Sequence, residues 1–255
     1  MAITASQVSE LRQRTGVSMM QCKRALEESK GDEEKAIEIL RKMGAAKAAE
    51  KANRAMKEGI VVAETKGDKA VLVKLHCETD FVSKNPDFIA LANAAAEEAL
   101  KHGAEAAKEA KEAALKELFT KLGENMALEI KVLEGKGLGT YIHTNSKIGV
   151  VVDLRVPDEE KARDIAMHIA AMGPKHIRPE DVPAGEVEKE KAIWKELLRQ
   201  EGKPEAMFEK IMMGKEKKFR EESALLKQSF VKNGDQTVEE YLSGNTVIGF
   251  HRLSI

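Results

Sequence analysis

The chain has 255 residues, of which 33% are charged and 42% hydrophobic, a composition that excludes an intrinsically disordered protein. Lysine and arginine together number 42 and aspartate and glutamate 43, so the formal net charge is -1. This balance argues against a dedicated nucleic-acid-binding protein, which needs an excess of positive charge to neutralise phosphates. Because aromatic residues make up only 4% of the chain, we expect a core of aliphatic side chains.

The sequence shows no segment that would direct the chain to a membrane or out of the cell. Its N-terminal residues lack a basic region followed by an apolar run, and no stretch approaches the roughly 20 apolar residues that span a bilayer. Cys22 and Cys77 are far apart and are expected to be reduced thiols. We therefore expect a cytoplasmic protein.

Residues 1–54 predict a compact helical head. Three short amphipathic patterns begin at polar capping residues and end at glycines, the last of them at Gly44. The expected helices cover 6–14, 18–31 and 32–44. Residues 45–57 are rich in alanine and lysine and predict a helical linker.

Residues 55–139 predict an N-terminal core subdomain. Two strand-like runs flank the turn signal Lys66-Gly67-Asp68 and predict a hairpin. In the second run alternate residues from Val71 to Cys77 are apolar, so one face is expected to be buried. The expected elements are strands over 60–64 and 70–77, helices over about 86–100 and 105–122, and a strand over 125–132.

Residues 140–255 repeat this order and predict a related C-terminal core subdomain. Two helical patterns joined by Gly202-Lys203-Pro204 predict a protruding antiparallel helical hairpin at about 186–222. The remaining expected elements are strands over 139–143 and 148–156, a helix over 158–172, a short helix after Thr237 and a strand over 247–253. The fold class is α+β, with a small antiparallel sheet in each of the two subdomains.

No catalytic constellation stands out. The sequence lacks a P-loop, a nucleophile elbow and a metalloprotease helix. His76 and Cys77 are adjacent in an alternating strand, so they point to opposite faces and cannot chelate one ion. The glycine-rich run 135–139 has the wrong spacing for a dinucleotide fingerprint and predicts a hairpin connection. We predict no catalytic residue, metal or cofactor.

Two other functions remain as alternatives. A thiol enzyme would use Cys77 with His143 and would require an exposed thiolate of low pKa. A binding module of another kind would use the helical head to recognise ubiquitin-like or peptide ligands, with the core as a scaffold.

The segment Thr79-Asp80-Phe81-Val82, which we call the tip, lies between a predicted strand and a predicted helix, where loops often carry function. In one interpretation Phe81 and Val82 fold inward, since burying a phenylalanine is worth roughly 1.5–3 kcal/mol. In the other, Phe81 is a presented wedge and Asp80 an acid that meets a partner's helix N-terminus or basic group. The local pattern leaves both open.

Two strings resemble signatures of the bacterial elongation factor Ts family. One is Cys77-Glu78-Thr79-Asp80-Phe81-Val82-Ser83-Lys84, and the other runs from Leu11 to Leu26 in the head. Further likeness lies at 121–125, His143, 165–168, 179–182 and 217–219, so the resemblance covers nearly all of the chain in order. Lys74 and His76 depart from the pattern, which commonly has an acid and an asparagine there.

The resemblance implies a nucleotide exchange factor for elongation factor Tu, the GTPase that delivers aminoacyl-tRNA to the ribosome. It implies binding to the GDP-bound and nucleotide-free partner, a ubiquitin-associated-like head, a two-part core and the helical hairpin. In the family the pair that matches Asp80 and Phe81 intrudes near the partner's magnesium and phosphate site. The resemblance leaves open a homodimer or a two-plus-two complex with the partner.

The resemblance also implies which other positions touch the partner. They are Met19, Met20 and Lys23 in the head, Leu122, Gly123 and His143 in the core, Thr79 and Val82 beside the Asp80-Phe81 pair, and Val231 in a segment that contacts another domain of the partner.

Overall fold

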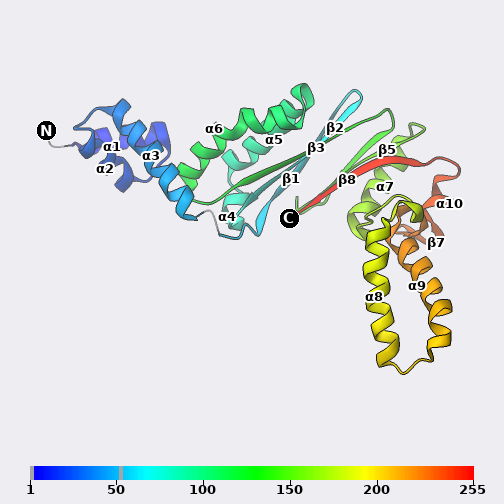
Figure 1. Ribbon diagram of the computed structural model, residues 1–255. Helices are drawn as coiled ribbons and strands as arrows, with labels where there is room; N and C mark the ends of the chain where they lie inside the picture. The colour runs from blue at the N-terminus through cyan, green and yellow to red at the C-terminus, as the bar shows by residue number, and fades with distance from the viewer. Residues whose placement is uncertain (1–2, 52–53) are drawn as a thin grey trace. The chain divides into compact units, whose positions relative to one another are not determined.

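The computed structural model describes residues 3–51 and 54–255, with the backbone alone for residue 45 and 47–51, and divides into two compact units (Figure 1). The first unit comprises the chain up to Val132, Ile142–Gly149 and Leu253–Ile255. The second comprises Leu133–Tyr141 and Val150–Arg252. The mixture of helices with small antiparallel sheets confirms the predicted α+β class.

The first unit begins with the three-helix head. Its helices are α1 (Ala5–Thr15), α2 (Met19–Glu28) and α3 (Glu33–Lys51). Their apolar faces enclose a small core of Val8, Leu11, Val17, Cys22, Ala25, Leu26, Ala36 and Leu40. The predicted three helices are therefore confirmed, because each one supplies an amphipathic face to a shared core.

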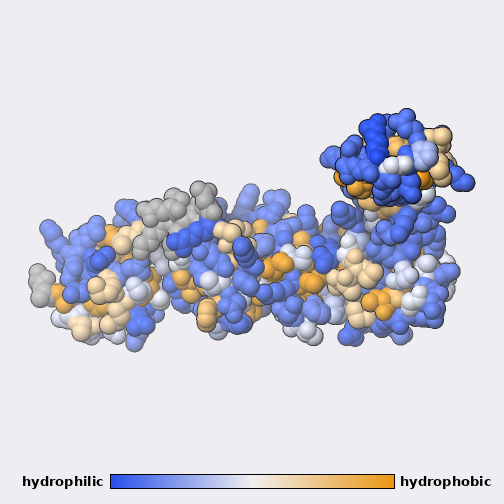
Figure 2. Space-filling model, turned by 90° about the horizontal axis from the view of Figure 1, so that it is seen from below, coloured by the Kyte–Doolittle hydropathy of each residue, from blue (hydrophilic) through white to orange (hydrophobic). Residues whose placement is uncertain are grey.

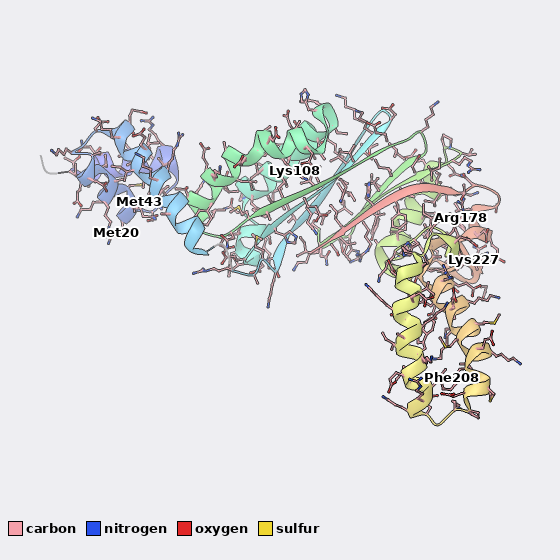
Figure 3. All side chains as sticks on the ribbon, in the orientation of Figure 1. Met20, Met43, Lys108, Arg178, Phe208 and Lys227 are labelled. Atoms are coloured by element: carbon pink, nitrogen blue, oxygen red, sulfur yellow. The ribbon has the colours of Figure 1, made fainter. Side chains whose placement is uncertain are left out.

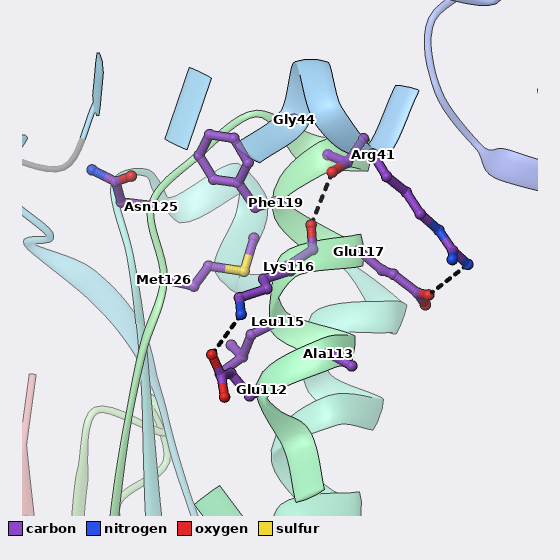
Figure 4. A pocket seen from close by; sticks show the side chains of 11 residues that line it. Arg41, Gly44, Glu112, Ala113, Leu115, Lys116, Glu117, Phe119, Asn125 and Met126 are labelled. Atoms are coloured by element: carbon purple, nitrogen blue, oxygen red, sulfur yellow. Dashed lines mark hydrogen bonds and ion pairs between the residues drawn. The ribbon is translucent and has the colours of Figure 1, made fainter. Parts of the chain in front are cut away.

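The end of α3 differs from the prediction. The helix continues through Gly44 to Lys51, so this glycine does not close it. Residues 54–57 are not helical, and 52–53 lie outside the described residues. The predicted helical linker is thus correct up to Lys51 and wrong for 54–57. Gly44 instead lies where α3 crosses α6 (Ala104–Leu122), beside an apolar cavity of about 530 Å³ (Figure 4).

The rest of the first unit is built on a sheet of order β1-β2-β3. The strands are β1 (Glu58–Lys66), β2 (Lys69–Cys77) and β3 (Ala127–Glu134). β1 and β2 pair antiparallel from Glu58 opposite Cys77 to Lys66 opposite Lys69, which leaves Gly67 and Asp68 as a two-residue turn. Gly67 has φ 62°, as the favoured hairpin turns require, so the predicted hairpin is confirmed.

Two long helices cover one face of this sheet. They are α5 (Pro86–His102) and α6, and a short helix α4 (Asp80–Ser83) precedes them. Asn85 caps α5 by accepting a hydrogen bond from the backbone N–H of Asp87 at 2.9 Å. The alternate residues of β2 from Val71 to Cys77 are buried against these helices. Leu72 is buried as well, because Gly149 approaches its side chain on the other face of the sheet.

The second unit contains most of a sheet of order β4-β5-β8. Its strands are β4 (Leu138–Ile142), β5 (Ile148–Leu154) and β8 (Val247–Ser254), and α7 (Glu159–Met172) packs against it. The glycine-rich run is not a hairpin connection, since it joins β3 and β4 of different sheets. A Cβ on Gly137 would lie 2.2 Å from the carbonyl oxygen of Leu154, so the glycine allows a close approach to β5.

The predicted helical hairpin is confirmed and projects from the second unit (Figure 3). It consists of α8 (Ala184–Gln200) and α9 (Phe208–Ser223), which lie side by side. Trp194 packs edge-on against Phe219, with ring centroids 5.8 Å apart. Lys191 of α8 forms an ion pair with Glu216 of α9 at 3.0 Å.

Smaller elements complete the second unit. They are the 3-10 turns η1 (Pro179–Asp181), η2 (Glu205–Met207) and η3 (Leu225–Lys227), the paired strands β6 (Ser229–Phe230) and β7 (Asn233–Thr237), and the helix α10 (Val238–Leu242). Among the helices of residues 3–51 and 54–255, none combines the length and the apolar character needed to cross a membrane.

Candidate functional site

The tip forms a single helical turn between β2 and α5. Thr79 is extended, with φ -127° and ψ 158°, and α4 begins at the next residue. Because successive residues of a helix point about 100° apart, the two apolar side chains diverge. Val82 is 7% exposed and packs in the core of the first unit, whereas Phe81 is 83% exposed. The inward interpretation is thus correct for Val82 and wrong for Phe81.

Exposure of apolar side chains is otherwise scattered. On the face shown in Figure 2, hydrophobic residues occur in small separate patches among hydrophilic ones. Of the large hydrophobic side chains in the described residues, Phe81 is the most exposed. Its exposed ring offers apolar area that a partner could bury, and an aromatic side chain buried at the centre of an interface is a common hot spot.

A carboxylate from a distant segment holds the base of the tip. Oε2 of Glu124 accepts hydrogen bonds from the backbone N–H groups of Glu78 and Thr79, at 3.1 and 3.0 Å. Oε1 of Glu124 accepts from the Thr79 hydroxyl at 2.6 Å. In return, Oε1 of Glu78 accepts from the backbone N–H of Asn125 at 2.9 Å. We call these four hydrogen bonds the Glu124 clamp.

The end of α6 places this carboxylate. Leu122 is the last helical residue and is partly buried against the core of the first unit. Gly123 follows in the left-handed conformation with φ 76°, and its N–H donates to the carbonyl of Phe119 at 2.7 Å. The chain therefore turns sharply and directs Glu124 to the tip. Two predicted core positions, Leu122 and Gly123, immediately precede the clamp.

The third core position lies at the same end of the β1–β2 hairpin. His143 is exposed in the connection between β4 and β5. Lys147 of this connection forms an ion pair with Glu58 at 2.7 Å. Glu58 lies opposite Cys77, the last residue of β2 before the tip segment. The structure thus brings the His143 connection, the end of α6 and the tip to one end of the hairpin.

Asp80 is charged and accessible. The hydrogen bond from Lys84, at 2.7 Å, lowers the pKa of Asp80 below its ordinary value, so the side chain is a carboxylate at neutral pH. Half of its side-chain surface is exposed. The tip therefore presents an anionic group beside an aromatic ring.

The predicted head positions lie on the exposed side of α2. Met19 is 46% and Met20 62% exposed, and Figure 3 shows Met20 at the outside of the head. Lys23 is exposed and lies 3.8 Å from Glu27. Flexible thioether side chains suit a surface that must adapt to a partner. Ser18 and Gln21 at the start of α2 line a cleft of about 260 Å³ in the first unit together with Leu122 and Gly123, so the start of α2 lies near these two predicted core positions.

Val231 belongs to the second unit. It is 45% exposed in the turn between β6 and β7. Its backbone N–H donates to Nδ1 of His168 at 3.1 Å, and His168 Nε2 lies 3.0 Å from Oε1 of Gln228. Because Nδ1 accepts, the neutral ring must carry its proton on Nε2 and donate it to Gln228. His168 is fully buried, and it fixes the backbone of the turn that presents Val231.

Acid should weaken this arrangement. Burial lowers the pKa of His168 below 6.5, and the hydrogen bond to Gln228 only partly opposes this. The unfolded chain therefore binds the proton more readily, so the stabilisation is complete above pH 6.5 and is lost as the pH falls. We expect the free energy of unfolding to decrease by up to about 1.4 kcal/mol per pH unit below that point. Urea titrations of the wild type and His168→Gln check this; equal pH slopes would contradict it.

Comparison with known proteins gives one answer. The sequence profile of the family described as Elongation factor TS matches residues 78–255. Elongation factor Ts of Aeromonas hydrophila is 44% identical, over 99% of this chain and 90% of the relative. The chain belongs to the elongation factor Ts family. Elongation factor Ts of a Hydrogenobaculum species is 42% identical over 100% of this chain and 99% of its own length.

Membership in the elongation factor Ts family bears on the alternatives. The relatives align with the head as well as the core, which argues against a head that acts as a separate binding module. The thiol-enzyme alternative required an exposed thiolate, but Cys77 is fully buried. Burial, together with the charges of Glu124 and Glu58, raises the pKa of Cys77 to about 12.

We therefore expect no thiol reactivity in the folded protein. With a pKa of about 12, about one Cys77 side chain in 10⁴ is ionised at pH 8, and Cys22 is buried too. Iodoacetamide followed by mass spectrometry should modify both cysteines only after denaturation. Rapid alkylation of Cys77 in the folded protein would reopen the thiol-enzyme alternative.

Two residues that support the candidate site were missed from the sequence. Glu124 was placed within a family-like string without a role, although a Gly-Glu-Asn sequence after a helix was a signal for a polar contact. His168 lies in the family-like range 165–168 without a role, and nothing in the local pattern connects it with Val231, which lies 63 residues away.

Proposed function

We propose that the chain is a guanine nucleotide exchange factor that binds elongation factor Tu and promotes the release of GDP. The observation that carries this proposal is the 83% exposure of Phe81 on a turn held by buried and hydrogen-bonded neighbours. A ring kept in water forgoes about 1.5–3 kcal/mol of burial free energy, which a pocket on a partner would recover. Such a buried aromatic anchor has the character of an interface hot spot.

In this proposal the tip disturbs the magnesium and phosphate site of the GTPase. A bound magnesium ion is the largest local charge at such a site. Displacing the groups that hold this ion therefore strongly weakens the binding of GDP. Phe81 would wedge between side chains of the partner, and the Asp80 carboxylate would compete for the polar groups around the ion. Elongation factor Tu would be bound both with GDP and without nucleotide.

The other predicted residues would extend the contact. Met19, Met20 and Lys23 would bind the same domain of the partner from the head, and Val231 would contact another domain. Leu122, Gly123 and His143 would face the GTPase beside the tip. Val82 would support Phe81 indirectly. Its own side chain is buried in the free protein and anchors the turn to the core.

Linkage explains how such a factor completes its cycle without chemistry. If the factor lowers the affinity for GDP by some ratio, GDP lowers the affinity for the factor by the same ratio. GTP binding then expels it. No covalent bond forms or breaks, so the proposed activity needs no catalytic residue and no cofactor, and it would operate during translation elongation in the cytoplasm.

The test is the release of fluorescent GDP from purified elongation factor Tu after addition of excess unlabelled nucleotide. We expect release to accelerate with the concentration of this protein and then to saturate. An unchanged release rate at saturating concentration would refute the proposal. Sedimentation of the nucleotide-free mixture would distinguish a one-to-one complex from a homodimer or a two-plus-two complex.

A further inference from the structure

We propose that Glu124 is a positioning residue of the exchange factor, because its carboxylate sets the conformation from which Phe81 is presented. This inference rests on the proposed function of the tip. It assigns a role to a residue that is not itself placed against the partner.

The tip cannot hold its own conformation. Helix α4 is four residues long, and no side-chain hydrogen bond of its own N-cap residue stabilises it. Helices this short are not stable in isolation, because forming the first turn costs more free energy than its hydrogen bonds return. An external group must therefore select this turn among the conformations open to the segment.

Glu124 supplies that group with both carboxylate oxygens. One oxygen binds the two successive N–H groups of Glu78 and Thr79, which fixes the backbone where it leaves β2. The other binds the Thr79 hydroxyl at 2.6 Å, which fixes the side chain at the first position of the turn. Hydrogen bonds to an ionised acceptor are roughly twice as strong as neutral ones.

The clamp is held from its other side as well. Asn125 is 9% exposed, and its backbone N–H donates back to Glu78. Arg54 lies 3.4 Å from the second oxygen of Glu78, so this carboxylate is constrained at both of its ends. Neither the α6–β3 connection nor the start of the tip can therefore move without breaking several hydrogen bonds.

The position of Phe81 follows from that of Thr79. The carbonyl of Thr79 accepts from the backbone N–H of Ser83 at 3.3 Å, which closes the turn around Phe81. Ser83 Oγ also donates to the carbonyl of Asp80 at 2.9 Å. A rotation of the backbone at Thr79 would therefore move the aromatic ring of Phe81. It would also pull Val82 out of the core.

Three substitutions of Glu124 distinguish the contribution of its side-chain length from that of its negative charge. Glu124→Gln keeps the length and an acceptor oxygen, and its amide can donate to the Thr79 hydroxyl, so exchange should stay within about threefold of wild type. Glu124→Asp keeps the charge but is one methylene shorter, and Glu124→Ala removes the group. We expect both to lower exchange by roughly tenfold or more, the range for losing hydrogen bonds to a charged acceptor.

A double-mutant cycle with Phe81→Ala separates positioning from general stability. If Glu124 acts by placing the ring, Glu124→Ala should slow exchange little further once Phe81 is alanine. The effects on the urea midpoint should instead add. If Glu124→Ala does not fold, Thr79→Val is the milder variant, because it removes only the hydroxyl contact with Glu124 and should also slow exchange. Thr79→Ser keeps the hydroxyl and should exchange nucleotide as the wild type does. Additive effects on exchange across the cycle would overturn the proposal.

Hydrogen exchange of the protein without any partner keeps this test independent of the proposed function. The amides of Glu78 and Thr79 should be protected in the wild type and in Glu124→Gln, and should exchange at least about tenfold faster in Glu124→Ala. Equal protection in all three proteins would refute the clamp even if GDP release is accelerated. If the wild type does not accelerate GDP release, the proposed function fails and the amide result still decides whether the clamp exists.

Discussion

Replacing Phe81 with alanine should remove most of the exchange activity and leave the fold intact. Truncation of a hot-spot side chain costs about 2–4 kcal/mol of binding free energy, which corresponds to roughly a 30- to 1,000-fold loss. Because the ring is 83% exposed, its removal should change the free energy of unfolding by no more than about 0.5 kcal/mol. Stopped-flow release of fluorescent GDP and urea denaturation measure the two quantities separately.

The adjacent residue is the matched control. Val82 is 7% exposed and packs in the core of the first unit. Val82→Ala should therefore destabilise the protein by roughly 1–3 kcal/mol. Phe81→Leu, which keeps an apolar side chain of smaller area, should fall between wild type and Phe81→Ala in exchange. A large loss of stability in Phe81→Ala with unchanged exchange would contradict the outward interpretation of the ring.

The tip shows how far sequence reasoning reached. The alternating residues of β2 and the helix expected from about residue 86 placed the segment between a strand and a helix, and both elements are confirmed. Neither pattern could say that Phe81 points outward and Val82 inward. That choice depends on Glu124, which is 45 residues from Thr79 in the chain and reaches it through a side-chain contact. Local periodicity contains no information about such a contact.

The short strands β6 and β7 were also not predicted from the sequence, although the short helix α10 was. Strand β6 has two residues, too few for an alternating pattern, so the paired strands that present Val231 were not predicted. The long elements were predicted well because their apolar faces repeat over several turns, as in α5, α6 and the helical hairpin. The family resemblance supplied the position of Val231, and the buried His168 supplies its physical support.

Gly44 was predicted to end the third helix of the head, and this prediction was wrong. A glycine after an amphipathic pattern usually ends a helix, but α3 continues past it. The reason lies on α6: a Cβ at Gly44 would be 2.2 Å from Oγ1 of Thr120 and 3.0 Å from its Cβ. The glycine is needed for the close crossing of the two helices, next to the Arg41–Glu117 ion pair (Figure 4).

Whether Gly44→Ala raises or lowers the free energy of unfolding therefore tests how closely the head packs on α6. Alanine should stabilise the interior of an isolated helix by about 1 kcal/mol relative to glycine. Overlap with Thr120 should cost more, typically about 1–3 kcal/mol for an overpacked contact. We expect net destabilisation in urea and slower exchange, because the crossing holds the head that carries Met19 and Met20.

Gly214 is the matched control for this change. It lies inside α9, and a Cβ there would meet nothing within 4 Å, so Gly214→Ala should stabilise the protein by up to about 1 kcal/mol. Adding Thr120→Ala to Gly44→Ala removes the 2.2 Å overlap and should restore much of the lost stability and exchange. If Gly44→Ala instead stabilised the protein as Gly214→Ala does, α3 and α6 would not cross closely in solution. The head would then reach a partner without a fixed position on the core, and Phe81 would have to act without its support.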